Sequence, residues 1–208
     1  LALVYWRQGR AREAIETLEA ALKAGVTQSE VRIKLGQYLA ESGQPAKAIE
    51  LLGATAGDDP DALIALGNAY VIAGREPDAV RTFQRLLAND PRNAVAHENL
   101  GAAYLRAGNL PAAEPPLREA IALDPNRPGA HTALGVVLAG TGREAEAIEA
   151  WTRAVALEPR ELNALYNLVV YLSRMGRRDE ARVYGERFIA LAPRMMRADA
   201  ERVRALIR

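Results

Sequence analysis

Residues 100–125 read LGAAYLRAGNLPAAEPPLREAIALDP, and this stretch decides the fold. A Leu-Gly pair opens a run of helix-forming residues, a second glycine follows at Gly108, and Pro125 closes the stretch. A glycine after an apolar helical run suits the left-handed position that ends a helix, and a proline cannot continue one. The stretch therefore predicts a helix, a tight turn, a second helix and a stop.

The same spacing recurs along the whole chain. The turn glycines lie 34, 31, 34, 34 and 34 residues apart, at Gly9, Gly43, Gly74, Gly108, Gly142 and Gly176. An alanine follows each of them by five residues, and prolines recur at Pro60, Pro91, Pro125, Pro159 and Pro193. Helical units of this size cannot bury their apolar side alone and must stack on their neighbours. The period predicts an all-α solenoid.

Glycines also recur inside the first helix of four repeats, where a glycine costs about 1 kcal/mol relative to alanine. Gly101 and Gly135 follow leucines at these positions. We expect each to let the second helix approach closely, with the small residues Ala113 and Ala147 facing it.

These residues resemble the tetratricopeptide repeat (TPR) family. One unit carries the pattern as Leu134, Gly135, Leu138, Gly142, Ala147, Trp151, Ala154 and Pro159. The resemblance implies an α-solenoid of helix-turn-helix repeats with a C-terminal capping helix. It predicts one array over 1–208, with a partial repeat at 1–28, full repeats at 29–59, 60–93, 94–127, 128–161 and 162–193, and the capping helix at 194–208.

Three departures from the pattern predict local changes. Asp58-Asp59-Pro60 reads as a helix N-cap followed by proline at the first helical position. Pro115 and Pro116 fall inside an expected helix, so we predict a distorted or late-starting helix over 110–117. Gly185 stands where a large side chain is expected, and we predict that Met195 or Met196 of the C-terminal segment fills the gap.

Composition excludes several classes of protein. The 208 residues carry 27 basic and 26 acidic side chains, a net charge of +1, which gives no global attraction to nucleic acid or membranes. Cysteine is absent, so disulfides and cysteine-ligated metals are excluded. No apolar run approaches the roughly 18 residues that span a bilayer. Because Leu1 to Gln8 read as the second half of a helix, we expect that further sequence precedes them.

The chain offers little for catalysis. Serine occurs only at 29, 42 and 173, and no phosphate-binding glycine loop is present. His97 and His131 occupy equivalent places in successive repeats, and we interpret them as packing residues because two ligands strain a shared metal site. We therefore predict no catalytic residue, no metal and no cofactor.

The TPR resemblance implies that the first helices of successive repeats line a groove for a peptide. Carried over position by position, it assigns to this groove Ile33, Gln37, Ile64, Asn68, Glu98, Asn99, Arg106, Thr132, Val136, Tyr166, Asn167, Val170 and Arg174, together with Lys34. Asn99 and Arg106 recur 68 residues later, which suggests polar clamps around an apolar slot that hold a carboxylate-bearing peptide. Trp6 is either an exposed aromatic anchor or, as we prefer, packed on preceding or neighbouring chain.

The sequence thus predicts a non-catalytic scaffold that binds a peptide or helical segment of another protein. The alternative is a regulatory or substrate-positioning domain of a larger enzyme. RNA binding is disfavoured because residues 41–173 are net acidic. Residues 174–208 carry ten basic and five acidic side chains, which suits a solvated capping helix, nucleic acid or an acidic partner, and the first is preferred. Exposed repeat ends also allow a homo-oligomer.

Overall fold

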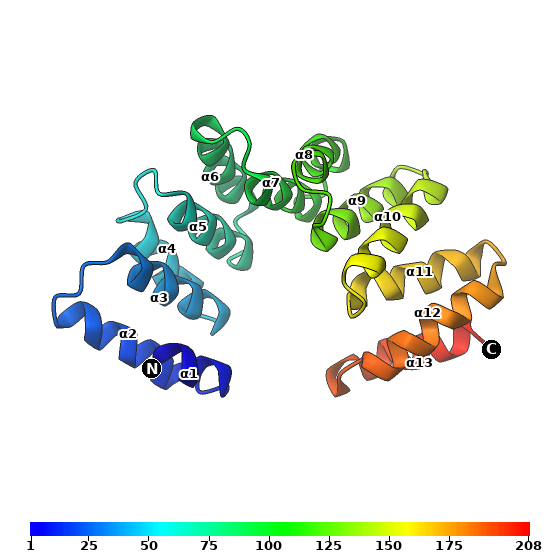
Figure 1. The fold of residues 1–208 in the computed structure, drawn as a ribbon, viewed down its shortest axis with the longest axis horizontal. Coiled ribbons are helices and arrows are strands. Elements are labelled where there is room, and N and C mark those ends of the chain that lie inside the picture. The colour runs from blue at the N-terminus through cyan, green and yellow to red at the C-terminus, as the bar shows by residue number, and fades with distance from the viewer. The chain divides into compact units, whose positions relative to one another are not determined.

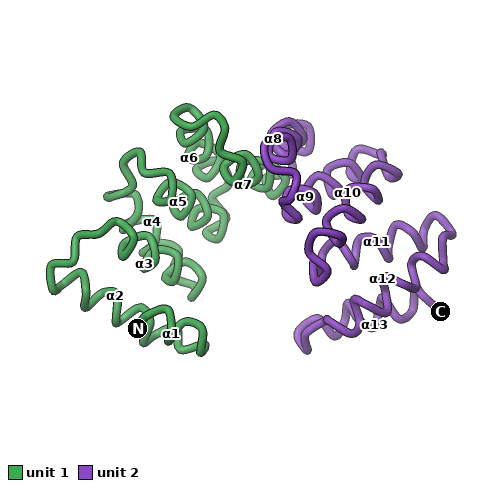
Figure 2. Tube along the Cα trace, viewed as in Figure 1, with its two compact units in different colours: residues 1–107 green, residues 108–208 purple.

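The computed structural model describes residues 1–208, and every regular element in it is a helix (Figure 1). The chain divides into two compact units, Leu1–Ala107 and Gly108–Arg208 (Figure 2). The all-α class predicted from the repeat period is confirmed. The division falls inside the predicted repeat 94–127, between its two helices, and the single array over the whole chain stays a prediction.

Unit 1 is a serial stack in which each helix contacts the next one along the chain, and the first helices of neighbouring repeats also touch. Its helices are α1 (Ala2–Arg7), α2 (Ala11–Lys23), α3 (Ser29–Glu41), α4 (Pro45–Gly53), α5 (Pro60–Ile72), α6 (Glu76–Asn89) and α7 (Ala94–Arg106). The apolar core lies between consecutive helices, as repeats without an independent core require.

Unit 2 follows the same serial order and ends with an additional helix. Its helices are α8 (Leu110–Leu123), α9 (Pro128–Gly140), α10 (Glu144–Leu157), α11 (Leu162–Arg174), α12 (Arg178–Leu191) and α13 (Arg197–Leu206), with a short 3₁₀ turn η1 (Arg194–Met196) before α13. The last helix packs against both α11 and α12. It covers the end of unit 2, as a capping helix does.

The turns and helix starts follow the sequence expectations. All six turn glycines have left-handed φ values, from 69° at Gly74 to 83° at Gly43. Asp59 caps α5, where its Oδ1 accepts the backbone N–H groups of Asp61 at 3.0 Å and Ala62 at 3.3 Å. Pro60 occupies the first turn of α5, as the Asp-Pro pair predicts.

Three mid-helix glycines face a large side chain of the second helix, so the predicted contact of Gly135 with the small Ala147 is wrong, while that of Gly101 with Ala113 stays a prediction. The pairs within one repeat are Gly36 with Leu52, Gly67 with Phe83, and Gly135 with Trp151. A Cβ atom added at Gly135 would lie 2.4 Å from Nε1 of Trp151. The close approach is therefore a small-against-large fit, in which the ring of Trp151 fills the space that a side chain on the first helix would occupy.

The prediction of a late helix start at the paired prolines is also wrong. α8 begins at Leu110, with Asn109 as its N-cap accepting the N–H of Ala112 at 3.2 Å, and it continues through Pro115 and Pro116. The two prolines lack an N–H and so withhold hydrogen bonds only from the carbonyls one turn earlier. These carbonyls belong to the first turn, where partly exposed residues leave the backbone within reach of water.

The space beside Gly185 is filled by the C-terminal segment, but not by a methionine. A Cβ atom at Gly185 would lie 2.7 Å from Cγ2 of Ile207 and 3.2 Å from Cγ1 of Val203. Met195 is 89% exposed. The segment was predicted correctly and the filling residues were not, because α13 turns its Val203 side inward and the methionines lie before its first turn.

Candidate functional site

A hollow of about 400 Å³ lies between the first helices α3 and α5 of unit 1. Its lining residues are Ser29, Glu30, Ile33, Lys34, Gln37, Asp59, Asp61 and Ile64. The period therefore brings together Ile33, Gln37 and Ile64, three of the residues assigned to the groove from the TPR resemblance. Ile33 is 9% exposed and Ile64 is half-buried, so the two isoleucines form an apolar floor.

The rim of this hollow is polar and net negative. Lys34 donates from Nζ to Oε1 of Gln37 at 3.1 Å, which leaves the amide nitrogen of Gln37 free to donate. Three carboxylates, those of Glu30, Asp59 and Asp61, line the hollow against one ammonium group. Sequence reasoning used Asp59 only as a helix cap, so it missed that the start of α5 also brings acidic groups to the hollow.

The other predicted groove residues of unit 1 lie outside the lining of this hollow. Asn68 is exposed on α5, and Glu98 and Asn99 are half-buried on α7. The guanidinium of Arg106 reaches the end of α5 and the start of α6: Nη2 donates to the carbonyl of Val71 at 3.3 Å, and Nε lies 3.7 Å from Glu76.

Unit 2 presents uncharged residues at the corresponding places on its first helices. Thr132 and Val136 on α9 and Tyr166, Asn167 and Val170 on α11 are all half-buried. The backbone carbonyl of Thr132 accepts a hydrogen bond from Nε1 of Trp151 at 3.1 Å, and the ring of Tyr166 packs on Phe188 with centroids 5.7 Å apart. Part of this surface is therefore tied to the second helices.

The two predicted clamp arginines have the same partner in each unit. Arg174 lies 3.2 Å from Glu144 at the start of α10, just as Arg106 reaches Glu76 at the start of α6. In both pairs the glutamate follows a turn glycine by two residues and the arginine comes 30 residues later. This spacing was readable from the sequence and was missed. A role of these arginines in holding a ligand carboxylate stays a prediction.

The histidines serve the loops between repeats. Nε2 of His97 bonds to the carbonyl of Pro91 at 2.9 Å, and Nε2 of His131 bonds to the carbonyl of Pro125 at 3.0 Å. Each ring therefore ties the loop before its helix to that helix. No group of three His, Asp or Glu side chains is placed to hold a metal ion.

Trp6 packs within the chain. Its ring stacks on Tyr38 of α3 with centroids 4.0 Å apart and planes 2° from parallel. Neither the exposed anchor nor the contact with preceding or neighbouring chain is needed to explain this residue. Burial raises the pKa of the Tyr38 hydroxyl.

Second helices α8 and α10 are joined by an ion-pair network. Glu114 of α8 lies 2.7 Å from Arg118 on its own helix and 2.7 Å from Arg143 before α10. Arg143 also pairs with Glu146 at 2.6 Å. Hydrogen bonds from Arg118 and Arg143 hold the pKa of the Glu114 carboxyl below its usual range.

None of the helices is both long enough and apolar enough to cross a membrane.

The chain matches known repeat proteins over most of its length. A model of the tetratricopeptide repeat matches residues 1–62, 33–94, 64–128 and 132–195. A MamA crystal structure is 26% identical and covers 76% of this chain and 94% of its own, with a TM-score of 0.65. TTC0263, a thermophilic TPR protein of Thermus thermophilus, is 24% identical and covers 86% of this chain and 99% of its own, with a TM-score of 0.71. No curated relative matches the sequence.

Proposed function

Because the chain belongs to the tetratricopeptide repeat family, whose members generally mediate protein–protein interactions, we propose that it is a scaffold whose first-helix surface binds a peptide or helical segment of a partner protein. The observation that carries the proposal is the hollow between α3 and α5, with two isoleucines as its floor and polar groups around them. Peptide sites of this kind combine an apolar anchor with a few directed hydrogen bonds.

The lining of the hollow indicates the chemistry of the bound segment. An aliphatic side chain suits the floor of Ile33 and Ile64, because burying it there removes apolar surface from water. The carboxylates of Glu30 and Asp61 favour a lysine or arginine beside that anchor. The amide of Gln37 can donate to a backbone carbonyl of the segment. We therefore propose a segment with an aliphatic residue next to a basic one.

The test uses peptides selected against the full chain from a random display library, with affinities measured by calorimetry. We expect the selected peptides to combine aliphatic and basic residues and Ile64→Glu to weaken their binding about tenfold or more, because it places a carboxylate on the apolar floor. Ile72→Glu is the matched control, since Ile72 lies on the same helix, is 48% exposed and does not line the hollow. Equal effects of both variants, or no effect of Ile64→Glu, would refute the proposal.

A further inference from the structure

A second hollow, of about 580 Å³, lies at the other end of the chain, between the end of α12 and α13. Its lining residues are Ile189, Ala192, Pro193, Arg194, Arg197, Ala200 and Arg204. Its lining combines aliphatic groups with three arginines. No aromatic side chain lines it, so it lacks the stacking surface on which single-stranded nucleic acids bind.

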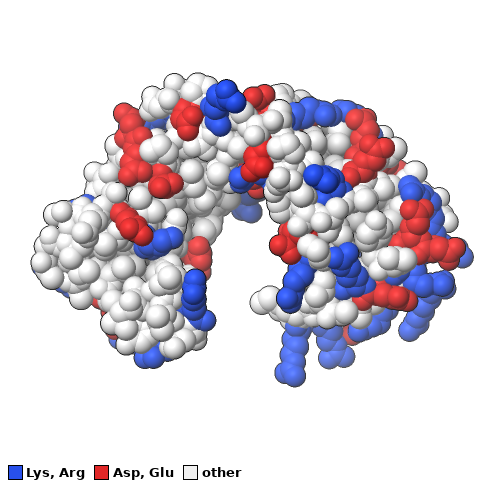
Figure 3. Space-filling view, viewed as in Figure 1, with Lys and Arg blue, Asp and Glu red and all other residues white.

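Two of the three arginines have no acidic partner. Arg197 pairs with Glu201 at 3.0 Å, whereas Arg194 and Arg204 make no ion pair and no side-chain hydrogen bond. Figure 3 shows basic side chains projecting from this end of unit 2. Arg106, Arg143, Arg174 and Arg177 each have a glutamate within reach, whereas Arg194 and Arg204 belong to the arginines of the chain that have none. The hollow therefore combines an apolar surface with uncompensated positive charge.

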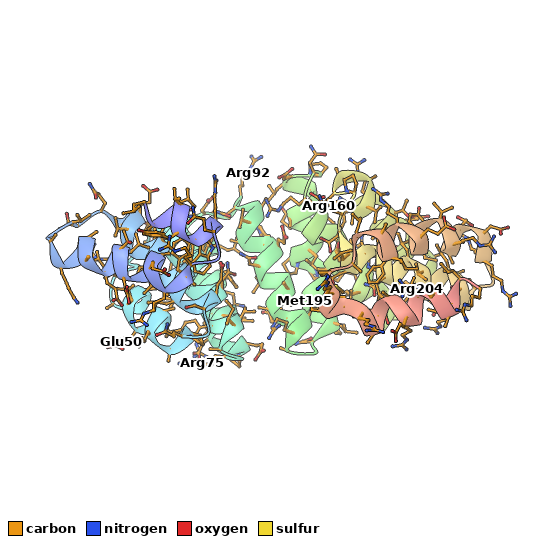
Figure 4. The ribbon with its side chains drawn as sticks, turned by 90° about the horizontal axis from the view of Figure 1, so that it is seen from below. Glu50, Arg75, Arg92, Arg160, Met195 and Arg204 are labelled. Carbon is orange, nitrogen blue, oxygen red and sulfur yellow. The ribbon has the colours of Figure 1, made fainter.

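The spacing of the arginines on α13 restricts the partner. Arg197 and Arg204 are seven residues apart, two helical turns, which places them about 10 Å apart along the helix axis. Ala200 lies between them on the hollow, and its small side chain leaves room for an apolar group. Figure 4 shows α13 in the foreground, with Met195 near its start and Arg204 farther along. A helix lying along α13 would present side chains with the same spacing.

We propose that this basic hollow, formed by η1, α13 and the end of α12, binds an acidic amphipathic helix of a partner protein. Carboxylates two turns apart on that helix pair with Arg204 at one end and with Arg194 and Arg197 at the other, and an apolar residue between them packs over Ala200. Guanidinium groups suit such pairs because they bind carboxylates through two parallel hydrogen bonds. The contact repeats the helix-on-helix packing found within unit 2 and is independent of the hollow between α3 and α5.

The probe is a fluorescein-labelled helical peptide of about 20 residues, with glutamates at i and i+7 and leucines at i+3 and i+4. Its counterpart carries lysines in place of the glutamates. Binding to the full chain is followed by fluorescence anisotropy at low and at high salt. We expect the glutamate peptide to bind, with weaker binding at high salt, and the lysine peptide not to bind.

A pair of charge-reversed double variants locates the site. Arg194→Glu with Arg204→Glu is expected to weaken binding of the glutamate peptide about tenfold or more. Arg202→Glu with Arg208→Glu is the matched control, because it changes the net charge equally on the same segment without touching the lining of the hollow. We expect it to weaken binding less than about threefold. Circular dichroism checks that both variants keep the helical content of the parent chain.

Several outcomes would overturn the proposal. Equal losses in the two double variants would show diffuse attraction, and equal binding of the two peptides would show an apolar contact without charge selection. Failure of the glutamate peptide to bind would reject the site. Tighter binding of a single-stranded RNA of similar length, lost in the Arg194 and Arg204 variant, would assign the hollow to nucleic acid. Self-association of the chain that the same variant abolishes would assign it to a second copy.

Discussion

The helix pairs α9–α10 and α11–α12 of unit 2 differ in what fills the space beside their glycine, a side chain of the paired helix in the first and the C-terminal segment in the second. In the first pair the small residue, Gly135, is on the first helix and the large one, Trp151, is on the second. One period later the order is reversed, with Val169 on the first helix and Gly185 on the second. Val169 is fully buried. Beside Gly185 the second helix has no side chain of its own, and Val203 of α13 and the following Ile207 pack there.

The comparison shows that the space beside a glycine in a repeat can be filled from within the helix pair, as by Trp151, or from outside it, as by Val203 and Ile207. It also shows how an array can end. A glycine on the second helix leaves space in which a helix outside the repeats can pack. The terminal helix then covers the apolar surface that another repeat would have covered.

Of the substitutions that test this comparison, Trp151→Ala is expected to lower the free energy of unfolding most. The ring is 1% exposed, fills the space over Gly135 and donates a hydrogen bond to Thr132. Its loss leaves a cavity, and we expect the free energy of unfolding to fall by about 3–5 kcal/mol, measured by urea denaturation with far-ultraviolet circular dichroism. A loss below about 1 kcal/mol would show that α9 and α10 collapse onto each other without the ring.

Gly185→Leu tests the other half of the comparison. The added side chain meets Ile207 and Val203, so we expect α13 to be displaced, with a loss of about 1–3 kcal/mol in the free energy of unfolding and faster trypsin cleavage within 197–206. Gly53→Ala is the control, because the space around Gly53 is open and its helical backbone accepts alanine, so stability rises by up to about 1 kcal/mol. Unchanged resistance of α13 to trypsin would contradict the packing of α13 beside Gly185.

Arg174→Ala sharpens the comparison at the contact between α10 and α11. The pair of Arg174 with Glu144 is more than half exposed on the arginine side, so its removal is expected to cost less than about 1 kcal/mol in thermal or chemical unfolding. Arg178→Ala, which removes an arginine of the next helix without an ion pair, should leave stability unchanged. A loss of several kcal/mol in Arg174→Ala would mean that this pair, rather than apolar packing, holds the helices together.

The smallest expected effect concerns acid stability. Arg143 pairs with Glu114 of the preceding second helix, α8. Arg177, the equivalent residue of the next repeat, pairs only with Glu180 of the helix that follows it. The folded-state pKa of Glu114 is lowered, so its contribution to stability is present above the ordinary glutamate pKa of 4.5 and is lost as pH falls through the folded value. We expect Glu114→Gln to lower Tm at about pH 7 and to have little effect at about pH 3. Equal shifts at both pH values would contradict this origin.

Much of the fold was predictable because the residues that begin and end its helices act locally. The turn glycines, the cap at Asp59 and the helix-ending prolines each act within one or two turns of the backbone, and the period repeats them. The partner of Gly135 was not predictable from the pattern, because spacing places a residue on a helix but does not say which neighbouring side chain lies across it. The prediction that Met195 or Met196 fills the space beside Gly185 failed for the same reason. Which face of α13 packs inward depends on the direction that the chain takes after Pro193.

The candidate site was predicted in part. The TPR resemblance assigned Ile33, Gln37 and Ile64 to one surface, and these three residues do line one hollow, while their contact with a ligand stays a prediction. It did not identify the acidic rim, because Glu30, Asp59 and Asp61 lie at helix starts, where acidic residues are already explained by their effect on the helix end. A further regularity was available and was missed: an arginine after the turn glycine pairs with an acid three residues later, as in Arg10 with Glu13 and Arg75 with Asp78.

The positions of the two tryptophans give each compact unit its own optical reporter. Trp6 stacks on Tyr38 in unit 1, and Trp151 is enclosed in unit 2, and the chain has no other tryptophan. Replacing either one by phenylalanine leaves intrinsic fluorescence that follows the melting of a single half of the molecule. Coincident melting curves for the two variants would mark one cooperative folding body, and separated curves would mark two.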